Sequence, residues 1–249
     1  MAGNYLAHGD GSIGRKMNIK IYADGADIND MLDAYDNNLI SGFTTNPTLM
    51  KKAGVKDYLS FVESVLFKIT DLPISFEVFS DDFEEMYTQA KKLSSLGDNV
   101  FVKIPVTNTK GESSKELIHR LDSESVKMNI TAVFTDQQVN DVLSAISGNM
   151  PHIISVFAGR IADTGVDPIP MMSKYLTKIK AHNKNLQLLW ASPREVLNVY
   201  QAENVGCDII TIVPALLKKL SLGGKSLEDF SRETVKMFYD DALASGFKL

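Results

Sequence analysis

The chain has 249 residues, of which 44% are hydrophobic and 23% charged, a composition typical of a globular protein large enough for one large or two small domains. Its 26 basic and 31 acidic residues give a net charge of −5 without a basic stripe, so nucleic-acid binding is not expected. The single cysteine, Cys207, excludes a disulfide framework or a multi-cysteine metal site within one chain, and the four histidines lack metal-ligand spacing.

The first sixteen residues are polar and contain several glycines, and they lack the apolar core of a secretory signal. We therefore expect a cytoplasmic protein that does not associate with membranes. Residues 1–16 are interpreted as a flexible N-terminal extension or as residues added to the native chain, since Met17 is a plausible alternative start. Residues 17–249 are predicted to form a single domain.

Short apolar segments of strand character alternate with helical segments along the chain. The eight strand segments are residues 19–24, 42–46, 74–79, 100–106, 127–134, 152–159, 186–192 and 207–214. Helical patterns, several of them opening with Ser, Thr, Asp or Pro, occupy residues 82–97, 113–125, 135–147, 170–182 and 193–205. This alternation is typical of parallel strands joined by helical crossovers, so the predicted fold class is α/β.

Eight strand segments in a chain of this length match the number that closes a (β/α)8 TIM barrel. A doubly wound open sheet is the alternative, but no GxGxxG turn follows residues 19–24. The amphipathic segment 226–245 comes after the eighth unit and is predicted to be an additional C-terminal helix. It could cover a barrel end, pack as an ordinary helix, or dock on a neighbouring subunit.

Lys103 lies in the middle of VFVKIPV, residues 100–106, whose other side chains favour a buried strand. A fully buried lysine is rare unless its charge is paired, because taking an ammonium out of water is costly. Barrel enzymes carry their active sites at the carboxyl ends of the strands, and polar residues occur near those ends here. They are Asp24, Thr45, Asn46, Glu77, Lys103, Asn129, Thr131, Ser155, Arg160, Ser192 and Arg194.

Several of these residues also have a purely structural interpretation. Asp24 could cap a helix, and Asn46, which precedes a proline, could set a turn. Glu77 and Lys103 could be a buried structural pair, although such a pair gains little stability over apolar residues. The two arginines could be solvated surface residues. The joint placement of the set on one barrel face favours a functional site.

The chemistry expected of this set follows from Lys103. Burial lowers the pKa of a lysine, so that more of it is free amine able to attack a carbonyl and form an imine. The imine accepts electrons while a neighbouring C–C bond breaks, and Glu77 or Asp24 would act as acid/base. Thr131 and Asn129 would fix a water or a hydroxyl. Two arginines suit a phosphate, so a phosphorylated sugar is the expected substrate.

Six segments resemble successive motifs of the transaldolase family, in order along residues 19 to 220. They are GFTTNPT (42–48), VKIP (102–105), NITAVF (129–134), SVFAGRIAD (155–163), WASPRE (190–195) and CDIITIVPALLKKL (207–220). The resemblance implies a class I, Schiff-base barrel enzyme of the pentose phosphate pathway. Such an enzyme moves a dihydroxyacetone unit from fructose 6-phosphate or sedoheptulose 7-phosphate to an aldose phosphate. No metal or organic cofactor is implied.

The resemblance also implies a role for each matching position. Lys103 would form the imine, and Glu77 would be the acid/base working through a water held by Thr131. Asp24 would exchange a proton with the hydroxyl beside the breaking bond. The implied substrate-binding residues are Thr45, Asn46, Asn129, Ser155, Phe157, Arg160, Ser192 and Arg194. Of these, Arg160, Ser192 and Arg194 would hold the phosphate.

Two positions bear on the choice between two activities within the family. The small fructose 6-phosphate aldolase branch resembles this chain in size but has tyrosine at the position of Phe157 and glutamine at that of Glu77. A phenol near the enamine can help to protonate it and release free dihydroxyacetone, whereas a phenyl ring leaves the enamine to await an acceptor aldehyde. The sequence therefore favours a transaldolase, and the aldolase, or a class I enzyme with another acceptor, is the alternative.

Two interpretations of other kinds stay open at this stage. The chain could be a different lysine-dependent lyase, such as a deoxyribose-phosphate-type aldolase, or a phosphosugar-binding barrel without turnover. Helices around a closed barrel often leave apolar patches for self-association, so a homo-oligomer is expected, of a size that the sequence does not fix.

Overall fold

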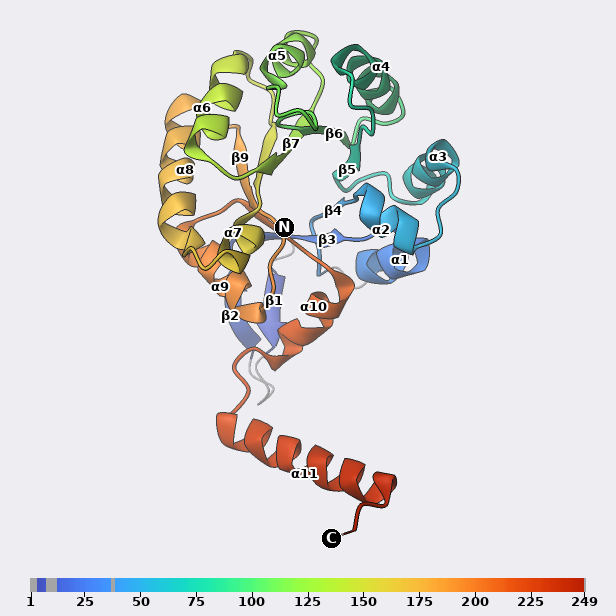
Figure 1. Cartoon of the computed structure of the whole chain (residues 1–249), viewed down its shortest axis with the longest axis vertical. Coiled ribbons are helices and arrows are strands. Elements are labelled where there is room, and N and C mark those ends of the chain that lie inside the picture. The colour runs from blue at the N-terminus through green and yellow to red at the C-terminus, as the bar shows by residue number, and fades with distance from the viewer. Residues whose placement is uncertain (1–3, 8–12, 37–38, 249) are drawn as a thin grey trace.

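A closed parallel barrel forms the body of the molecule, in a computed structural model that describes residues 4–7, 13–36 and 39–248 (Figure 1). Eight strands follow one another around the barrel in chain order, with the last pairing to the first. They are β3 (Lys20–Asp24), β4 (Gly42–Thr44), β5 (Ile74–Glu77), β6 (Val100–Pro105), β7 (Met128–Val133), β8 (Ile153–Val156), β9 (Gln187–Trp190) and β10 (Ile209–Ile212). The (β/α)8 prediction is confirmed.

Helices surround the strands on the outside of the barrel (Figure 1). They are α1 (Ile28–Asp36), α2 (Pro47–Lys52), α3 (Tyr58–Lys68), α4 (Phe83–Ser94), α5 (Lys115–Ser123), α6 (Asp136–Ala145), α7 (Ala158–Asp163), α8 (Pro168–His182), α9 (Val196–Val205), α10 (Pro214–Lys219) and the 3-10 turn η1 (Leu220–Leu222). The predicted helices correspond to α4, α5, α6, α8 and α9. The sequence did not predict α1, α2, α3, α7 and α10.

Local side chains explain why three of the unpredicted helices begin where they do. Asp27 accepts the backbone N–H groups of Asn29 and Asp30 at the start of α1. Asn46 and Asp57 are the N-cap residues of α2 and α3, each accepting an N–H of the first turn. Asn and Asp are favoured at this position because their side-chain oxygens satisfy donors that have no partner within the helix.

An apolar plug fills the inside of the barrel below its polar layer. It consists of buried Tyr22, Phe101, Ile153, Leu189, Ala191 and Ile209, and it is separate from the main core between strands and helices. Because side chains alternate along a strand, Tyr22 and Asp24 project to the same side of β3. Phe101 and Lys103 are related in the same way on β6. The polar residues at the strand ends therefore lie directly above this apolar plug, where charges interact more strongly than in water.

Gly42 allows the largest side chain of this plug to fit. A Cβ atom on Gly42 would lie 2.6 Å from Cζ of Tyr22, which is directly opposite in the register of β3 and β4. No real Cβ makes so close a contact, so this strand position has room only for glycine. The ring of Tyr22 occupies the space that a side chain on β4 would otherwise fill.

Two strands precede the barrel, where the sequence predicted no element. β1 (Asn4–Ala7) and β2 (Ile13–Met17) pair antiparallel as a two-stranded sheet outside the barrel. They include described residues of the segment 1–16, which was interpreted as a flexible or added extension; residues 1–3 and 8–12 of that segment lie outside the described residues.

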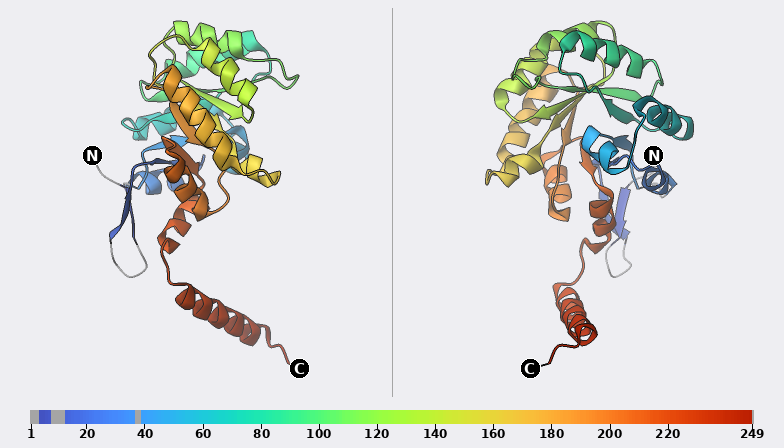
Figure 2. Two further views of the ribbon diagram at one scale, coloured as in Figure 1. Left: turned by 90° about the vertical axis from the view of Figure 1, so that its left-hand side faces the viewer. Right: turned by 45° about the vertical axis from the view of Figure 1, so that its right-hand side comes forward.

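The last helix, α11 (Leu227–Ser245), extends away from the barrel in all views (Figures 1 and 2). Ser226 caps its start, and Gly246, with φ +64, ends it in the left-handed conformation that glycine adopts without strain. None of its residues is buried. The predicted C-terminal helix is confirmed, but in this chain it neither covers a barrel end nor packs against the core. Among the described residues, no helix combines the length and apolarity needed to span a bilayer.

Candidate active site

Lys103 is buried inside the barrel, with 6% of its surface exposed. Its Nζ lies 2.9 Å from Oε2 of Glu77, the residue opposite it in the register of β5 and β6. The same Nζ donates to the backbone carbonyl of Thr45 at 2.7 Å. Both partners are acceptors, which suits a charged ammonium. The sequence predicted an isolated buried amine; instead the amine is paired with a carboxylate and a backbone carbonyl.

Glu77 is held in place from its backbone as well as through its ion pair. The phenol of Tyr58, on α3, donates to the Glu77 carbonyl at 2.6 Å. Burial, with the Glu77 charge as a further cause, raises the pKa of Tyr58, so the phenol stays protonated and keeps donating. The direct contact of Glu77 with Lys103 is closer than the water-mediated role implied by the family resemblance, and that role stays a prediction.

Asp24 ends β3 and faces the barrel interior. It does not cap α1, because Asp27 does so, and the capping interpretation of Asp24 is therefore wrong. Its Oδ1 accepts a hydrogen bond of 2.8 Å from Oγ1 of Thr44. Burial raises the pKa of Asp24, although the charge of Lys103 and the Thr44 hydrogen bond oppose the rise. A carboxyl group with a raised pKa takes up a proton more readily than an ordinary aspartate, as an acid/base has to.

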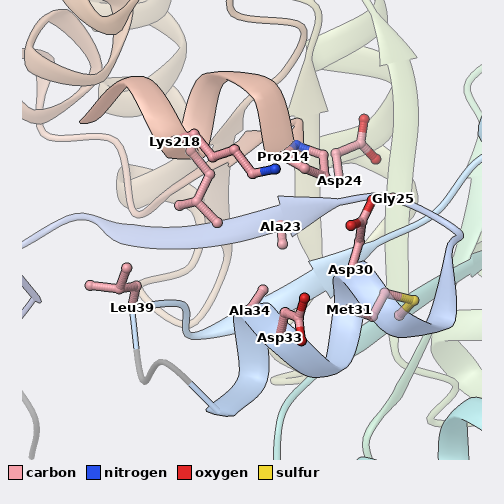
Figure 3. Close-up of a pocket in the computed structure, with 11 residues that line it drawn as sticks. Ala23, Asp24, Gly25, Asp30, Met31, Asp33, Ala34, Leu39, Pro214 and Lys218 are labelled. Atoms are coloured by element: carbon pink, nitrogen blue, oxygen red, sulfur yellow. The ribbon is translucent and has the colours of Figure 1, made fainter. Parts of the chain in front are cut away.

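A groove on the outside of the barrel, between α1 and α10, has Ala23 and Asp24 among its lining residues (Figure 3). Ala23 lies in its floor, while the carboxylate of Asp24 points away from Leu39 and Ala34, beyond the end of the strand (Figure 3). Ala23 and Asp24 face opposite sides of the barrel wall because neighbouring residues of a strand alternate. The carboxylate of Asp24 therefore lies on the interior side, where it meets Thr44.

Asn129 and Ser155 are buried and joined to each other. The Ser155 hydroxyl donates to Oδ1 of Asn129 at 2.6 Å, and Nδ2 of Asn129 donates to Oγ of Ser75 at 3.0 Å. Because one side of the amide accepts and the other donates, the network fixes its orientation. Ser75 was not predicted; it lies two residues before Glu77 and so shares its inward face.

Thr131 is buried next to a bulge at the end of β7. The register between β7 and β8 shifts between Ile130 and Val133, and Ala132 within the shift has φ +59. A bulge of this kind redirects the side chains beside it and is common at barrel rims near active sites. Thr131 thus comes to the interior at the height of Pro105, its register partner on β6.

Two predicted substrate-binding residues carry structural tasks. The Thr45 hydroxyl is buried and donates to the carbonyl of Ser75 at 2.9 Å, so it is not presented to a substrate. The contribution of Thr45 is its carbonyl, which holds Lys103. The Asn46 side chain accepts the N–H of Leu49 at 3.0 Å as the cap of α2, which leaves its amide hydrogens and one oxygen lone pair for another partner.

Arg160 and Arg194 lie exposed on α7 and in the loop after β9. Arg194 is bidentate to Asp163, with Nε 3.2 Å from Oδ1 and Nη2 2.5 Å from Oδ2. These hydrogen bonds, together with the charge of Arg160, hold the pKa of Asp163 below its usual range. The Arg160 guanidinium carbon lies 5.7 Å from the ring centroid of Phe157. Both cations therefore act on one carboxylate, and Arg160 also contacts the ring beside the site.

Gly159 brings α7 against the loop that carries Ser192. Its N–H donates to the Ala191 carbonyl at 3.1 Å, and a Cβ on it would lie 1.5 Å from the Ser192 carbonyl oxygen. Ser192 itself has φ +58, an uncommon backbone conformation for a residue other than glycine. This close approach sets the spacing between Arg160 on α7 and the loop after β9.

The structure thus brings Asp24, Glu77, Lys103, Asn129, Thr131 and Ser155 together inside the barrel and leaves Arg160, Ser192 and Arg194 at its rim. Sequence reasoning missed Thr44, Ser75 and Thr211. Each lies two residues from another inward-facing residue of its strand, and this spacing is the signal that could have found it. In the described part of the chain, no three His, Cys, Asp or Glu side chains gather as a set that could hold a metal ion.

Comparison with known proteins adds the family. The family model described as Transaldolase/Fructose-6-phosphate aldolase matches residues 21–248. The chain belongs to this family. A "Probable transaldolase" of Thermoplasma volcanium is 35% identical over 216 residues, which cover 86% of this chain and 93% of that protein. A "Probable transaldolase" of Chelativorans sp. (strain BNC1) is 34% identical over 221 residues, or 88% and 97% of the two chains. Relatives of the transaldolase/fructose-6-phosphate aldolase family indicate an enzyme of aldolase or transaldolase type.

Solved structures outside this transaldolase family share its fold. Tryptophan synthase subunit alpha from Campylobacter jejuni superposes with a TM-score of 0.55 at 16% identity, covering 83% of this chain and 90% of that one. KGPDC from Streptococcus mutans gives a TM-score of 0.54 at 13% identity, covering 83% and 93%. At such identities the likeness extends to the barrel fold alone.

Proposed function

We propose that this chain is a transaldolase that carries a dihydroxyacetone unit between phosphorylated sugars as a Schiff base on Lys103. The observation that carries the proposal is the buried Lys103–Glu77 pair, 2.9 Å apart inside a closed barrel of this family. Such a pair gains little stability over apolar residues, so its retention is better explained by chemistry. The same proposal implies a cytoplasmic enzyme of the pentose phosphate pathway.

Formation of the imine begins with proton transfer from Lys103 to Glu77. The neutral amine attacks the C2 carbonyl of a ketose phosphate such as fructose 6-phosphate and forms a carbinolamine. Glu77 returns the proton to the departing hydroxyl, water leaves, and an iminium remains. The apolar plug inside the barrel keeps bulk water from the reacting atoms on that side, which strengthens each charge interaction in these steps.

Cleavage and transfer then require a second acid/base. Asp24 takes the proton of the C4 hydroxyl while the C3–C4 bond breaks, and the bonding electrons pass into the iminium to give an enamine. The aldose phosphate leaves. An acceptor aldehyde is attacked by the enamine carbon, and Asp24 returns its proton to the new alkoxide. Water then hydrolyses the iminium and releases the new ketose phosphate, which restores the Lys103 amine.

Substrate binding is assigned to the polar groups around this pair. The joined side chains of Asn129 and Ser155 would hold the hydroxyls of the dihydroxyacetone unit, because they are fixed in orientation before substrate arrives. Arg160, Ser192 and Arg194 would bind the phosphate. The phosphate has to share Arg194 with Asp163, whose carboxylate occupies the bidentate position in the free enzyme.

Reductive trapping tests the proposed function. Borohydride added to the protein with fructose 6-phosphate is expected to leave a reduced dihydroxyacetone adduct, and mass spectrometry of peptides should locate it on Lys103. A parallel assay should show a new ketose phosphate only when an acceptor aldose phosphate is present. An unmodified Lys103 would refute the imine. Rapid release of free aldehyde and dihydroxyacetone without any acceptor would indicate an aldolase instead.

The Phe157→Tyr variant is expected to raise the release of free dihydroxyacetone. Phe157 is partly buried, and its ring lies 5.6 Å from that of Phe134 in the site wall. A phenol at this position can donate a proton to the enamine, and general acid catalysis makes a rise of about tenfold or more reasonable. Release of dihydroxyacetone from fructose 6-phosphate without acceptor is the measurement. Phe134→Tyr, which places a phenol one ring away, should give no comparable rise; equal release by both variants contradicts the assignment.

We also propose that the chain forms a homo-oligomer through α11. This helix buries no residue in its own barrel, yet Phe230 and Phe238 are 46% and 62% exposed on one of its faces. Leu227 and Leu243 are exposed as well. Large apolar side chains exposed on a helix that its own barrel does not cover mark an interaction surface, for which a second copy of this chain is the proposed partner.

Substitution on α11 tests this assembly. The double variant Phe230→Ser/Phe238→Ser is expected to shift the protein to a smaller species in size-exclusion chromatography with light scattering, because it removes apolar area from the interface. Arg232→Ser/Lys236→Ser changes the charged face and should leave the size unchanged. The barrel should remain folded in both, since α11 packs on none of its core. A wild-type protein that is monomeric at micromolar concentration contradicts the proposal.

A further inference from the structure

Two buried hydroxyls form a hydrogen-bonded chain that ends on Asp24. Oγ1 of Thr44, on β4, donates to Oδ1 of Asp24 at 2.8 Å. Oγ1 of Thr211, on β10, lies 2.5 Å from Oγ1 of Thr44. Both threonines are buried. The eighth strand, which supplied no predicted site residue, thus reaches the reacting carboxyl group through one intervening side chain.

The strand register explains how residues of two non-adjacent strands meet. Thr211 lies opposite Tyr22 across β10 and β3, and Thr44 lies opposite Asp24 across β3 and β4. The two hydroxyls therefore meet over the inner face of β3, between the ring of Tyr22 and the carboxyl group of Asp24. Valine would fill either threonine position with the same shape, so packing alone does not require a hydroxyl there.

The direction of the chain follows from the number of hydrogens. An ionised carboxylate only accepts, so the single hydroxyl hydrogen of Thr44 is given to Asp24. The Thr44 oxygen must then accept the hydrogen of Thr211. The order is Thr211 to Thr44 to Asp24, and both donors are fixed before any substrate binds. Hydrogen bonds in such a chain polarise one another, so the second donor strengthens the first.

This order makes the two oxygens of Asp24 unequal. Oδ1 accepts the hydrogen of Thr44, and a proton on Oδ1 would weaken this hydrogen bond, because the hydroxyl oxygen of a neutral carboxyl group is a poorer acceptor than a carboxylate oxygen. Oδ2 can take a proton without this loss. We propose that Thr211, acting through Thr44, is a positioning residue that holds Oδ1 of Asp24 so that Oδ2 exchanges the proton with the substrate hydroxyl. The proposal rests on the role given to Asp24 in the proposed function.

The charged groups around Asp24 set the sign of the expected pH effect. Lys103 on β6 and the Thr44 hydrogen bond lower the pKa of Asp24, whereas burial and Glu77 on β5 raise it. Asp30 of α1 and Lys218 of α10 line the groove on the outer side of the same strand. Removing the Thr44 hydroxyl removes one of the lowering influences and changes none of these charges. The acid limb of C–C cleavage, which needs ionised Asp24, should therefore move to higher pH.

The experiment compares Thr44→Val and Thr211→Val with the wild type in single-turnover release of glyceraldehyde 3-phosphate from fructose 6-phosphate across pH. The acid limb is expected to rise by about one pH unit in Thr44→Val, since a hydrogen bond to a charged group is lost, and by about half a unit in Thr211→Val. The plateau rate should fall by about tenfold in each, with the half-saturating concentration of fructose 6-phosphate unchanged, because the proposed role gives neither hydroxyl a contact with the substrate. Thr211→Ser, which keeps the hydroxyl, should restore both the rate and the limb.

The controls separate this proposal from the proposed function. Borohydride trapping on Lys103 should be equal in all variants, because imine formation uses Glu77. If the wild type traps no adduct, the proposed function fails. If all variants trap the adduct but the acid limb of Thr211→Val does not move, or Thr211→Ser behaves like Thr211→Val, the positioning role is refuted. Should Thr211→Val melt below the assay temperature, the contrast of Thr211→Ser with Thr211→Ala gives the same decision.

Discussion

Lys103→Met is expected to lose the borohydride adduct and to lower kcat by at least about 10³-fold, because the nucleophile of the proposed reaction is gone. Methionine is similar in length and can fill the buried space of the lysine stem without supplying an amine. The loss should appear equally with fructose 6-phosphate and with any other donor, since every donor must form the imine. Trapping and steady-state transfer assays measure the two effects.

The same variant should also be less stable, for a reason separate from catalysis. Lys103→Met leaves Glu77, 19% exposed, without its partner, and an unpaired carboxylate near the core costs free energy. The expected loss is about 1–3 kcal/mol in the free energy of unfolding, below the cost for a fully buried pair because Glu77 keeps some contact with water. Urea denaturation measures it.

A double variant distinguishes the two effects of this substitution. Lys103→Met/Glu77→Gln removes both charges together and should recover most of the stability while remaining inactive. If the double variant regained activity, Lys103 would not be the nucleophile. If Lys103→Met were as stable as the wild type at all pH values, the ion pair would contribute nothing to the fold, and the amine would have to be held by the Thr45 carbonyl alone.

The barrel was predictable because its strands are buried on both faces and differ clearly from the helices between them. The predicted segments were a few residues too long at the ends. The segment 152–159 was predicted as strand, yet β8 ends at Val156 and α7 begins at Ala158. Strand length was overestimated there because apolar residues of the following helix continue the apolar run, and periodicity cannot separate the two over so short a distance.

Three of the missed helices, α2, α7 and α10, have only six residues each. α2 starts directly after Asn46, and the structural interpretation of Asn46 was that it sets a turn, not that it caps a helix. α7 also has six residues and no side-chain cap at its start. One and a half turns carry too little periodicity to be recognised, and such helices form because the barrel holds both of their ends.

The charged part of the site was predictable, whereas its neutral part was not. A lysine or glutamate within an apolar strand is conspicuous, so Lys103 and Glu77 could be found from the chain alone. Threonine and serine are ordinary strand residues, so Thr44 and Thr211 differ from a threonine on an outer face only by their spacing from other inward residues. Their role depends on closure of the barrel, which brings β10 to β3. The pairing of Arg194 with Asp163 likewise depends on how α7 meets the loop after β9.

Gly159→Ala is expected to damage the phosphate end of the site more than the imine end. The added Cβ would lie 1.5 Å from the Ser192 carbonyl oxygen and 2.4 Å from its carbon, so α7 or the loop after β9 must move. Overpacking of this severity should lower the free energy of unfolding by about 3 kcal/mol. Because Arg160 and Ser192 lie on the two segments that separate, KM for fructose 6-phosphate should rise by about tenfold or more.

A comparison of two donors and a second glycine makes this expectation specific. Fructose, which lacks the phosphate, should show little change in KM, since only the phosphate contacts are displaced. Gly165, which follows α7, has φ +82 and no atom within 4 Å of a new Cβ, so Gly165→Ala should cost about 1–2 kcal/mol through backbone strain and leave KM unchanged. Equal KM increases for both donors in Gly159→Ala would instead mean that the whole barrel mouth has shifted, and Arg160 and Ser192 would lose their assignment to the phosphate.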